Sequence, residues 1–579
     1  MKVSTKELPP TFVPANRGCY LVHQIIVMLN RTTHLTRPPV RISRCIVRLP
    51  SLLFVAFFAF AMGATTMACT DTTGLSDEDN TRPGNGDSDA GNGGGGDDGG
   101  TGHEGDGGDG EDAGEPCEGM ECDQVACPPD QPVTSLAGTV YIPSGQLPLP
   151  NAYVYIPTEE LAPLPEGASC QPCTEIVSGS PLVQTTTNHL GEFYLENVPA
   201  TDEVPLVIQS GKWRRTITIS NIDECTVNTI NDPEKLRLPR NRNEGNIPRV
   251  AVTTGNSDAL ECLVNKVGLD DSEFGVAGSD ASVHIYSAGG STGFSDGFNN
   301  GADFPSGTQW WSELAGVNDY DIVLFSCHYP SPFVSGNAAQ ALEAFTHLGG
   351  RAFMTDQQKS WLESGPNSFR NVAGWQGFSG PYDRTGIIDT SFAGGQQMAE
   401  WMNAVGALTG QNSFPAVELW DNIAWINQDV ARRWIYTSGD QTAYFDFHTP
   451  VGAEGSQQCG RVVYSDLHVA SAGNAEPWGR FPDNCNDQTQ SLSSQEKALV
   501  YMFFDLGACI IPDDCTPLTC AELGEGCGIF PDGCGGTVDC GECDGKCSQI
   551  GQSCTQNSDC CSQMCGIGAG DDVGECIIG

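Results

Sequence analysis

The chain has 579 residues, enough for several domains, and its formal net charge of −45 is unevenly distributed. Eight of the 28 lysines and arginines, but only one of the 73 acidic residues, precede position 69, so the remainder carries 20 bases against 72 acids. Such an acidic chain argues against nucleic acids and anionic lipid headgroups as partners, because both would be repelled.

Residues 1–68 have the pattern of an export signal. Three arginines at positions 41–48 precede the apolar run 52–62, and small residues then lead to Ala68. The run is shorter than the about 20 residues that a membrane-spanning helix needs. We therefore predict a signal peptide with a long leader, for which Met28 is an alternative start.

The pair Ala68-Cys69 resembles a lipobox, in which the cysteine is acylated and becomes the new N-terminus. This predicts a lipoprotein of the outer membrane or cell surface, attached through Cys69. Thr66 stands where leucine is usual, so ordinary cleavage and free secretion is the alternative. Residues 69–133 are rich in Gly, Asp and Glu and too polar to form a core, which predicts a disordered acidic stalk.

The cysteine content also indicates an exported protein. Twenty-three cysteines follow Cys69, and in an oxidising compartment such a number predicts disulfides, with one cysteine left over or paired between chains. The CxxC spacings at Cys170–Cys173 and Cys540–Cys543 are interpreted as structural disulfides. Neither has the helical context of an oxidoreductase.

Residues 134–245 are predicted to form a β-sandwich. Short apolar strands at 136–142, 152–156, 191–195, 204–208 and 214–219 are separated by Gly, Pro and Asn turns. The segments Gly138-Thr-Val, Asn151-Ala-Tyr-Val-Tyr and Asn188-His-Leu-Gly-Glu-Phe193 resemble a carboxypeptidase regulatory-like domain of the transthyretin type. The resemblance implies a non-catalytic spacer or adhesion module.

Residues 246–510 alternate between strands and helices. Buried strands are predicted at 249–253, 320–326, 351–355 and 461–467, and helices at 259–267, 337–348 and 495–506. This alternation predicts a flavodoxin-like α/β domain with a parallel sheet.

The strand beginning at Tyr320, the helix ending at Gly349-Gly350 and the late strand before His468 are similar to class I glutamine-amidotransferase-like and ThuA-like domains. The unit 134–509 also resembles a family of uncharacterised extracellular lipoproteins of myxobacteria. The matching stretches are 205–215, 247–252, 258–262, 271–274 and 459–468.

The tail contains twelve cysteines and divides into modules at 511–545 and 546–579. Both have too little apolar surface to fold without crosslinks. The six cysteines of the second module have a spacing that resembles an inhibitor cystine knot. The resemblance implies the pairs Cys547–Cys561, Cys554–Cys565 and Cys560–Cys576.

An amidotransferase needs a nucleophilic cysteine on the turn after a strand, with a histidine to activate it. The turn after 351–355 is Asp356-Gln357-Gln358 and contains no cysteine. Cys327 follows a different strand and is expected to form a disulfide with Cys262 or another core cysteine. Amidotransferase catalysis is therefore not expected.

Asp446 with His448, and Asp466 with His468, each lie two residues apart, so each pair faces one side of a strand. If the strands were neighbours, the four side chains could bind zinc or another divalent metal, and the sequence indicates no other cofactor. The alternative is that they are polar residues at strand ends. His468 and Asp466 are the candidates for catalysis, because ligands bind at the carboxyl edge of such sheets.

Nine of the ten tryptophans lie between 310 and 478, and exposed ones could stack on sugar rings, whereas Trp401 and Trp434 are expected in the core. The preferred hypothesis is a non-enzymatic surface lipoprotein that binds a polysaccharide or a surface protein. The alternative is a metal-dependent or degenerate hydrolase acting on carbohydrate or amide substrates.

Overall fold

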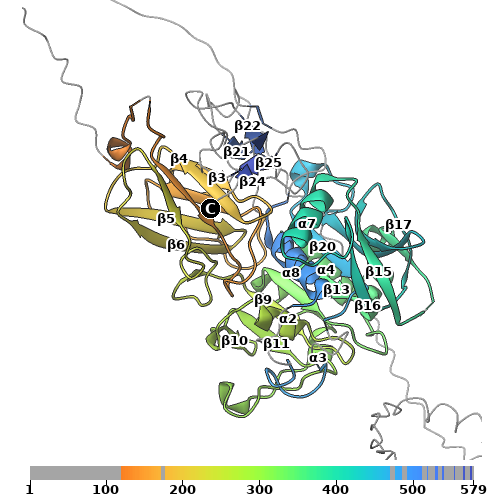
Figure 1. Ribbon diagram of the computed structural model, residues 1–579. Coiled ribbons are helices and arrows are strands. Elements are labelled where there is room, and N and C mark those ends of the chain that lie inside the picture. The colour runs from red at the N-terminus through yellow and green to blue at the C-terminus, as the bar shows by residue number, and fades with distance from the viewer. Residues whose placement is uncertain are drawn as a thin grey trace, which may run out of the picture. The chain divides into compact units, whose positions relative to one another are not determined.

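The computed structural model describes residues 119–510, apart from 129, 171–175, 378, 470–475 and 486–491, and several short segments of the cysteine-rich tail (Figure 1). The export signal, Cys69 and the stalk up to residue 118 lie outside the described residues. Within the part that is described, no helix is both long and apolar enough to cross a membrane.

Residues 135–246 form two β-sheets. The smaller has the order β4-β1-β7 and the larger the order β3-β2-β5-β6-β8. Alternating apolar side chains from both sheets, among them Leu136, Phe193, Val154 and Leu206, are buried in one core. The strands are β1 (Ser135–Thr139), β2 (Tyr153–Pro157), β3 (Pro181–Thr186), β4 (Glu192–Glu196), β5 (Glu203–Ser210), β6 (Trp213–Ser220), β7 (Val227–Ile230) and β8 (Gly245–Asn246).

Residues 119–133, which the sequence places in the stalk, are attached to these sheets. They contain the 3-10 helix η1 (Met120–Asp123), and Cys127 forms a disulfide with Cys225. The Gln124 side chain also donates to the carbonyl of Asn197. This part of the chain is therefore fixed by a covalent bond and is not a free linker.

The second region is built on a ten-stranded sheet with the order β10-β11-β9-β12-β13-β20-β19-β18-β15-β16. The first six strands in this order, β10-β11-β9-β12-β13-β20, pair in parallel. They are β9 (Val250–Thr253), β10 (Phe274–Gly275), β11 (Val283–Tyr286), β12 (Ile322–Phe325), β13 (Arg351–Thr355) and β20 (Gly460–Ser465). This half agrees with the α/β prediction.

The other half of the sheet is antiparallel, which the sequence analysis did not predict. Its strands are β15 (Tyr382–Ile388), β16 (Ser413–Leu419), β18 (Ala431–Thr437) and β19 (Gln441–Thr449). A tight turn with positive φ at Gly439 and Asp440 joins β18 to β19. So short a connection can join only antiparallel neighbours. A separate pair is formed by β14 (Ala373–Trp375) and β17 (Ile423–Ile426).

The helices predicted at 337–348 and 495–506 begin close to the expected residues because the sequence supplies caps. Ser335 caps α4 (Gly336–His347), and Ser493 forms a capping box with Glu496 at α8 (Ser494–Gly507). The other helices are α2 (Leu260–Lys266), α3 (Gly307–Trp310), α5 (Ser360–Glu363), α6 (Asn367–Arg370) and α7 (Ala393–Ala404). The further 3-10 helices are η3 (Asp271–Glu273), η4 (Asn299–Gly301), η5 (Val317–Asp319), η6 (Asp356–Lys359) and η7 (Gly455–Gln457).

Disulfides join distant parts of the described chain. Cys170 pairs with Cys459 and Cys262 with Cys485, over 289 and 223 residues of sequence. The expected disulfide of Cys327 is wrong. Cys327 is a buried free thiol, because Cys262 on α2 is bonded to Cys485 instead. Disulfides of this kind are consistent with an oxidising compartment.

In the tail, two small antiparallel sheets are described. The first pairs β21 (Ile529–Pro531) with β22 (Thr537–Asp539), and the second has the order β23-β25-β24, formed by Ser553–Cys554, Gly574–Cys576 and Cys565–Gly566. The predicted pairing of the last six cysteines lies outside the described side chains and stays a prediction.

Candidate functional site

Three polar side chains meet at the carboxyl ends of adjacent parallel strands. Cys327 follows β12, Asp356 follows β13 and His468 follows β20. The thiol of Cys327 lies 3.1 Å from Oδ2 of Asp356, and Nε2 of His468 lies 3.5 Å from the same oxygen. One donor atom from each residue lies within 4.8 Å of the other two, and all three residues are buried.

The register of the sheet explains why these residues meet. Phe325 of β12 pairs with Met354 of β13, which in turn pairs with Tyr464 of β20. Three parallel strands aligned in this way end at the same level, so the first residues beyond them share one edge. The three side chains therefore meet although 29 positions of sequence separate Cys327 from Asp356 and 112 separate Asp356 from His468.

Asp356 occupies the turn where the amidotransferase resemblance would place the nucleophile. Its φ is 45°, a left-handed value that costs free energy for a residue with a side chain. Its Oδ1 accepts hydrogen bonds from Gln357 Nε2 (2.7 Å) and Asn422 Nδ2 (2.5 Å), and its carbonyl accepts one from Tyr464 (2.9 Å). A carboxylate held this way is oriented and is not available as an exposed nucleophile.

The charges of the site are strongly coupled. Burial opposes a charge on His468, but Asp356, Asp258 and Asp466 outweigh it and raise the pKa of His468 to about 9. Burial also opposes a charge on Asp356, yet His468 holds the pKa of Asp356 below its usual value. Burial, with the charge of Asp356, raises the pKa of the Cys327 thiol well above its usual value. At neutral pH the site therefore contains an Asp356–His468 ion pair beside a neutral thiol.

Asp466, one of the two catalytic candidates from the sequence, adjoins this cluster. Its Oδ1 accepts hydrogen bonds from Tyr464 (2.8 Å) and from Asn422 Nδ2 (2.8 Å), the same amide that reaches Asp356. Burial and the nearby charge of Asp356 raise the pKa of Asp466 to about 8. Asp466 is thus mainly protonated at neutral pH and is a hydrogen-bonding neighbour of the ion pair.

The structure does not bring the candidate ligands Asp446 and His448 together with Asp466 and His468. The two strands are neighbours, as the hypothesis required, but they are antiparallel, with Asp446 opposite Val463 and His448 opposite Arg461. The first pair therefore lies beside the start of β20 and the second pair beyond its end. The Oδ2 of Asp446 instead accepts a hydrogen bond of 2.6 Å from Arg461.

Several members of the site were missed from the sequence. Asp258, in the loop after β9, accepts hydrogen bonds from Thr355 Oγ1 (2.9 Å) and the amide of Val469 (2.8 Å). Asn422 comes from the antiparallel half of the domain. A signal existed for Thr355, which ends a predicted strand, and for Asp258, which lies between a predicted strand and a predicted helix, but none existed for Asn422.

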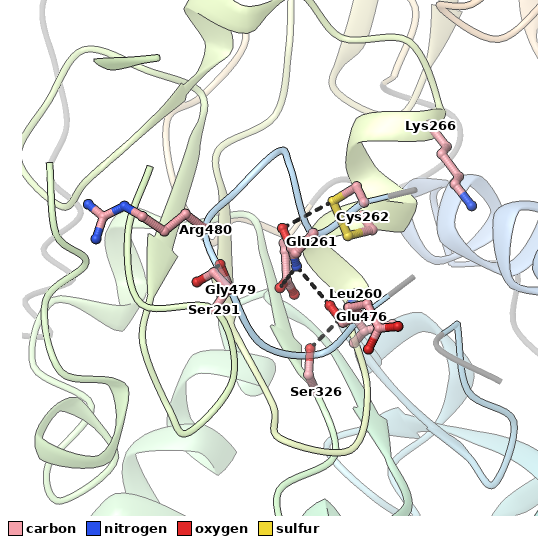
Figure 2. Close-up of a disulfide and its surroundings, with 12 residues drawn as sticks. Leu260, Glu261, Cys262, Lys266, Ser291, Ser326, Glu476, Gly479 and Arg480 are labelled. Atoms are coloured by element: carbon pink, nitrogen blue, oxygen red, sulfur yellow. Dashed lines mark hydrogen bonds between the residues drawn. A yellow bond between two sulfur atoms is a disulfide. The ribbon is translucent and has the colours of Figure 1, made fainter. Parts of the chain in front are cut away.

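Helix α2 is locked to this edge of the sheet, as Figure 2 shows. The amide of Leu260 donates to Oγ of Ser326, the residue before Cys327, at 3.3 Å. Next to it, the Cys262–Cys485 disulfide joins α2 to the chain beyond His468. The helix is thereby bonded to the end of β12 and to the loop that contains Cys485.

The loops around this edge carry aromatic side chains on the surface. Tyr329 and Phe333 follow β12 and Trp478 lies in the segment after β20, with exposed fractions of 57%, 90% and 59%. In contrast, Trp401 and Trp434 are buried, as predicted.

Two glycines bring these loops together. A Cβ at Gly290 would lie 2.2 Å from the carbonyl oxygen of Gly255 and 2.6 Å from that of Pro477, and one at Gly289 would lie 2.8 Å from the ring of His328. A side chain at Gly290 would force the loops apart, whereas one at Gly289 would displace the His328 ring.

No family model matches the sequence, and no curated protein matches it. Among solved structures, ThuA-like proteins from Bacteroides uniformis and Parabacteroides merdae are similar at 11% and 10% identity. They cover 44% and 51% of this chain and 89% and 97% of their own, with TM-scores of 0.23 and 0.26.

A β-galactosidase from Bacillus circulans matches at 10% identity over 49% of this chain and 33% of its own, with a TM-score of 0.23. Nothing about substrate or activity follows from scores this low. ThuA-like proteins are structural neighbours of this chain, but at these TM-scores the likeness carries no argument, and the transthyretin-like resemblance stays a prediction.

Proposed function

We propose that this protein binds a neutral polysaccharide outside the cytoplasm, at the cell envelope, through the aromatic loops at the carboxyl edge of its α/β sheet. The observation that carries the proposal is the exposure of Tyr329, Phe333 and Trp478 on loops that pack together. Aromatic side chains of this size are normally buried, and a group of them on one edge is typical of a binding surface.

The loops are held in place before any ligand arrives. Asn256 donates to the carbonyl of Tyr329 at 2.6 Å and accepts a hydrogen bond from its amide at 2.8 Å, and the carbonyl of Gly479 accepts one from Thr292 at 3.2 Å. A rigid aromatic platform loses little conformational entropy on binding, which favours stacking on sugar rings. The excess of acidic residues selects for an uncharged polymer, since anionic ones would be repelled.

The anchor belongs to the same proposal. Acylation of Cys69 would hold the stalk at the membrane and present the described domains to the outside. The disulfides of the described residues support a location in an oxidising compartment. Mass spectrometry of the mature N-terminus tests this part, with a diacylglyceryl-modified Cys69 as the expected product and an unmodified one as the contrary result.

A glycan array probed with the full chain tests the binding. We expect neutral polysaccharides to be retained and Trp478→Ala or Phe333→Ala to weaken binding at least about tenfold, the equivalent of one lost aromatic contact. Trp425→Ala is the matched control, because Trp425 is similarly exposed, at 54%, but belongs to β17. Equal losses in Trp478→Ala and Trp425→Ala, or no glycan bound, would contradict the proposal.

A hydrolase acting on carbohydrate or amide substrates is the second candidate. It is favoured by the Asp356–His468 pair at the carboxyl edge, where α/β enzymes place catalytic groups. A hydrolase is disfavoured because the carboxylate of Asp356 already accepts hydrogen bonds from Gln357 and Asn422. Turnover of a bound glycan that disappears in His468→Gln would favour this candidate over the binding protein.

A further inference from the structure

We propose that Cys327, Asp356 and His468 form a zinc site, which is a property beyond glycan binding and independent of it. Of the described residues, these are the group of His, Cys, Asp and Glu side chains whose donor atoms lie close enough together to hold one ion. They come from three adjacent strands, so the sheet itself fixes their spacing.

The distances fit one tetrahedral ion. With Zn–S of about 2.3 Å and Zn–O and Zn–N of about 2.0–2.1 Å, two ligand atoms should lie roughly 3.4–3.6 Å apart. The structure has 3.1 Å from Sγ of Cys327 to Oδ2 of Asp356 and 3.5 Å from that oxygen to Nε2 of His468. The third distance, from Sγ of Cys327 to Nε2 of His468, is no more than 4.8 Å, so the two atoms have to approach to complete the geometry.

The state of His468 is an independent indication of a missing ligand. Its Nε2 is buried and has the ion-pair contact of 3.5 Å with Oδ2 of Asp356, a distance at which it makes no hydrogen bond of good geometry. A buried polar nitrogen without a hydrogen bond is rare in folded proteins and calls for an explanation such as an absent ion. A metal bound at Nε2 supplies one.

The state of Cys327 is a second indication. Within the described residues it is the free cysteine, whereas Cys262, Cys485, Cys170 and Cys459 are in disulfides. A thiol kept unpaired and buried in such a protein is consistent with a role as a metal ligand. Thiolate, imidazole and carboxylate together are a donor set that suits zinc better than the harder calcium or magnesium.

The surroundings would orient the ligands and balance the charge. Gln357 and Asn422 hold the other oxygen of Asp356, which leaves Oδ2 turned toward the cluster. On binding, the thiol and the imidazolium each release one proton, so a zinc ion with one thiolate and one carboxylate is neutral overall. Three protein ligands leave a fourth position for water or another donor.

Metal titration of the purified full chain, stripped with a chelator and kept free of disulfide reductants, tests the site. We expect one equivalent of zinc, and with cobalt(II) in its place a thiolate-to-cobalt charge-transfer band and the visible spectrum of a tetrahedral ion. Cys327→Ser should abolish the charge-transfer band, and His468→Gln should weaken binding by more than about 100-fold, more than the loss of a supporting residue costs.

His448→Gln is the matched control, since it removes a buried histidine of the same sheet that lies beside the start of β20. It should bind one equivalent with an unchanged cobalt spectrum. Binding that persists with the same spectrum in Cys327→Ser would assign the metal to other residues and overturn the proposal. So would a wild-type chain that binds no zinc while its near-ultraviolet circular dichroism remains that of the folded protein.

Discussion

Two Asp-x-His pairs lie on neighbouring segments of one sheet and have opposite electrostatic states. At Asp446 and His448, burial is outweighed for the acid by Arg461 and Arg432, which lower the pKa of Asp446 to about 2. Burial itself dominates for the imidazole and lowers the pKa of His448 to about 3. At the other end of β20, Asp466 and His468 have their pKa values raised to about 8 and about 9.

The difference comes from the partners and not from the motif. Burial keeps the histidine of the first pair neutral, and arginines from β18 and β20 keep its aspartate charged. Beside the second pair, Asp356 and Asp258 keep the histidine charged, while burial and the charge of Asp356 keep Asp466 protonated. Identical spacing in the sequence therefore predicts a shared face but says nothing about the charge state.

The largest expected effect that separates the two pairs is in acid. The unfolded chain takes up a proton on His448 near pH 6.5, whereas the folded chain, whose histidine faces Arg461, Arg432, Arg351 and Asp446, does so only near a pKa of about 3. The contribution of His448 to stability should thus fall by roughly 3 kcal/mol between about pH 6.5 and about pH 4, and the difference between wild type and His448→Gln should change by that amount. Urea unfolding of wild type and His448→Gln at both pH values measures it.

His468→Gln is the control for this comparison. In the metal-free protein the folded chain keeps the proton on His468 over that range, and the unfolded chain, with a pKa near 6.5, gains only the last half of one, so removing His468 should leave nearly all of the His448 contribution in place. If His448→Gln has the same pH dependence of stability as wild type, or if His468→Gln changes that dependence as much as His448→Gln does, the assignment of opposite charge states is wrong.

The next effect is the loss of stability when the aspartate of each ion pair is replaced, beside arginines at Asp446 and beside His468 at Asp356. Asp446→Asn leaves Arg461 and Arg432 without this carboxylate, and arginine cannot shed its proton, although Arg461 keeps its ion pair of 2.5 Å with Asp505. We expect a loss of about 3 kcal/mol, the lower end for a broken buried pair. Asp356→Asn should cost less, about 1–2 kcal/mol, because His468 can become neutral. Chemical denaturation followed by tryptophan fluorescence gives both values, and the reverse order would contradict the argument.

The smallest effect concerns the two disulfides that brace opposite ends of the sheet. Replacing Cys262 and Cys485, or Cys170 and Cys459, by alanines should lower stability by amounts within about 1 kcal/mol of each other, because loops of 223 and 289 residues close with nearly equal entropy. Only the Cys262–Cys485 disulfide lies beside the cluster of Cys327, Asp356 and His468. Alkylation of Cys327 in the native protein should therefore accelerate when Cys262 and Cys485 are replaced and not when Cys170 and Cys459 are replaced. Equal rates in the two variants would contradict this.

Local patterns in the sequence determined most of the parallel half of the sheet. The strand at 351–355 coincides with β13, and the helix predicted at 337–348 begins one residue from α4, because apolar runs and a serine cap act within a few residues. The antiparallel half was missed, since its strands are separated by loops and turns whose partners the sequence alone does not specify.

The site depended on tertiary structure. From the sequence, Asp466 and His468 could be placed after a strand, and Asp356 on the turn that lacks a cysteine. That Cys327, Asp356 and His468 meet follows from the parallel register of β12, β13 and β20. That Asp446 and His448 do not join them follows from the antiparallel pairing of β19 with β20. Residues close in the sequence determine where strands and helices form, whereas strand direction and register are set by the packing of the whole sheet.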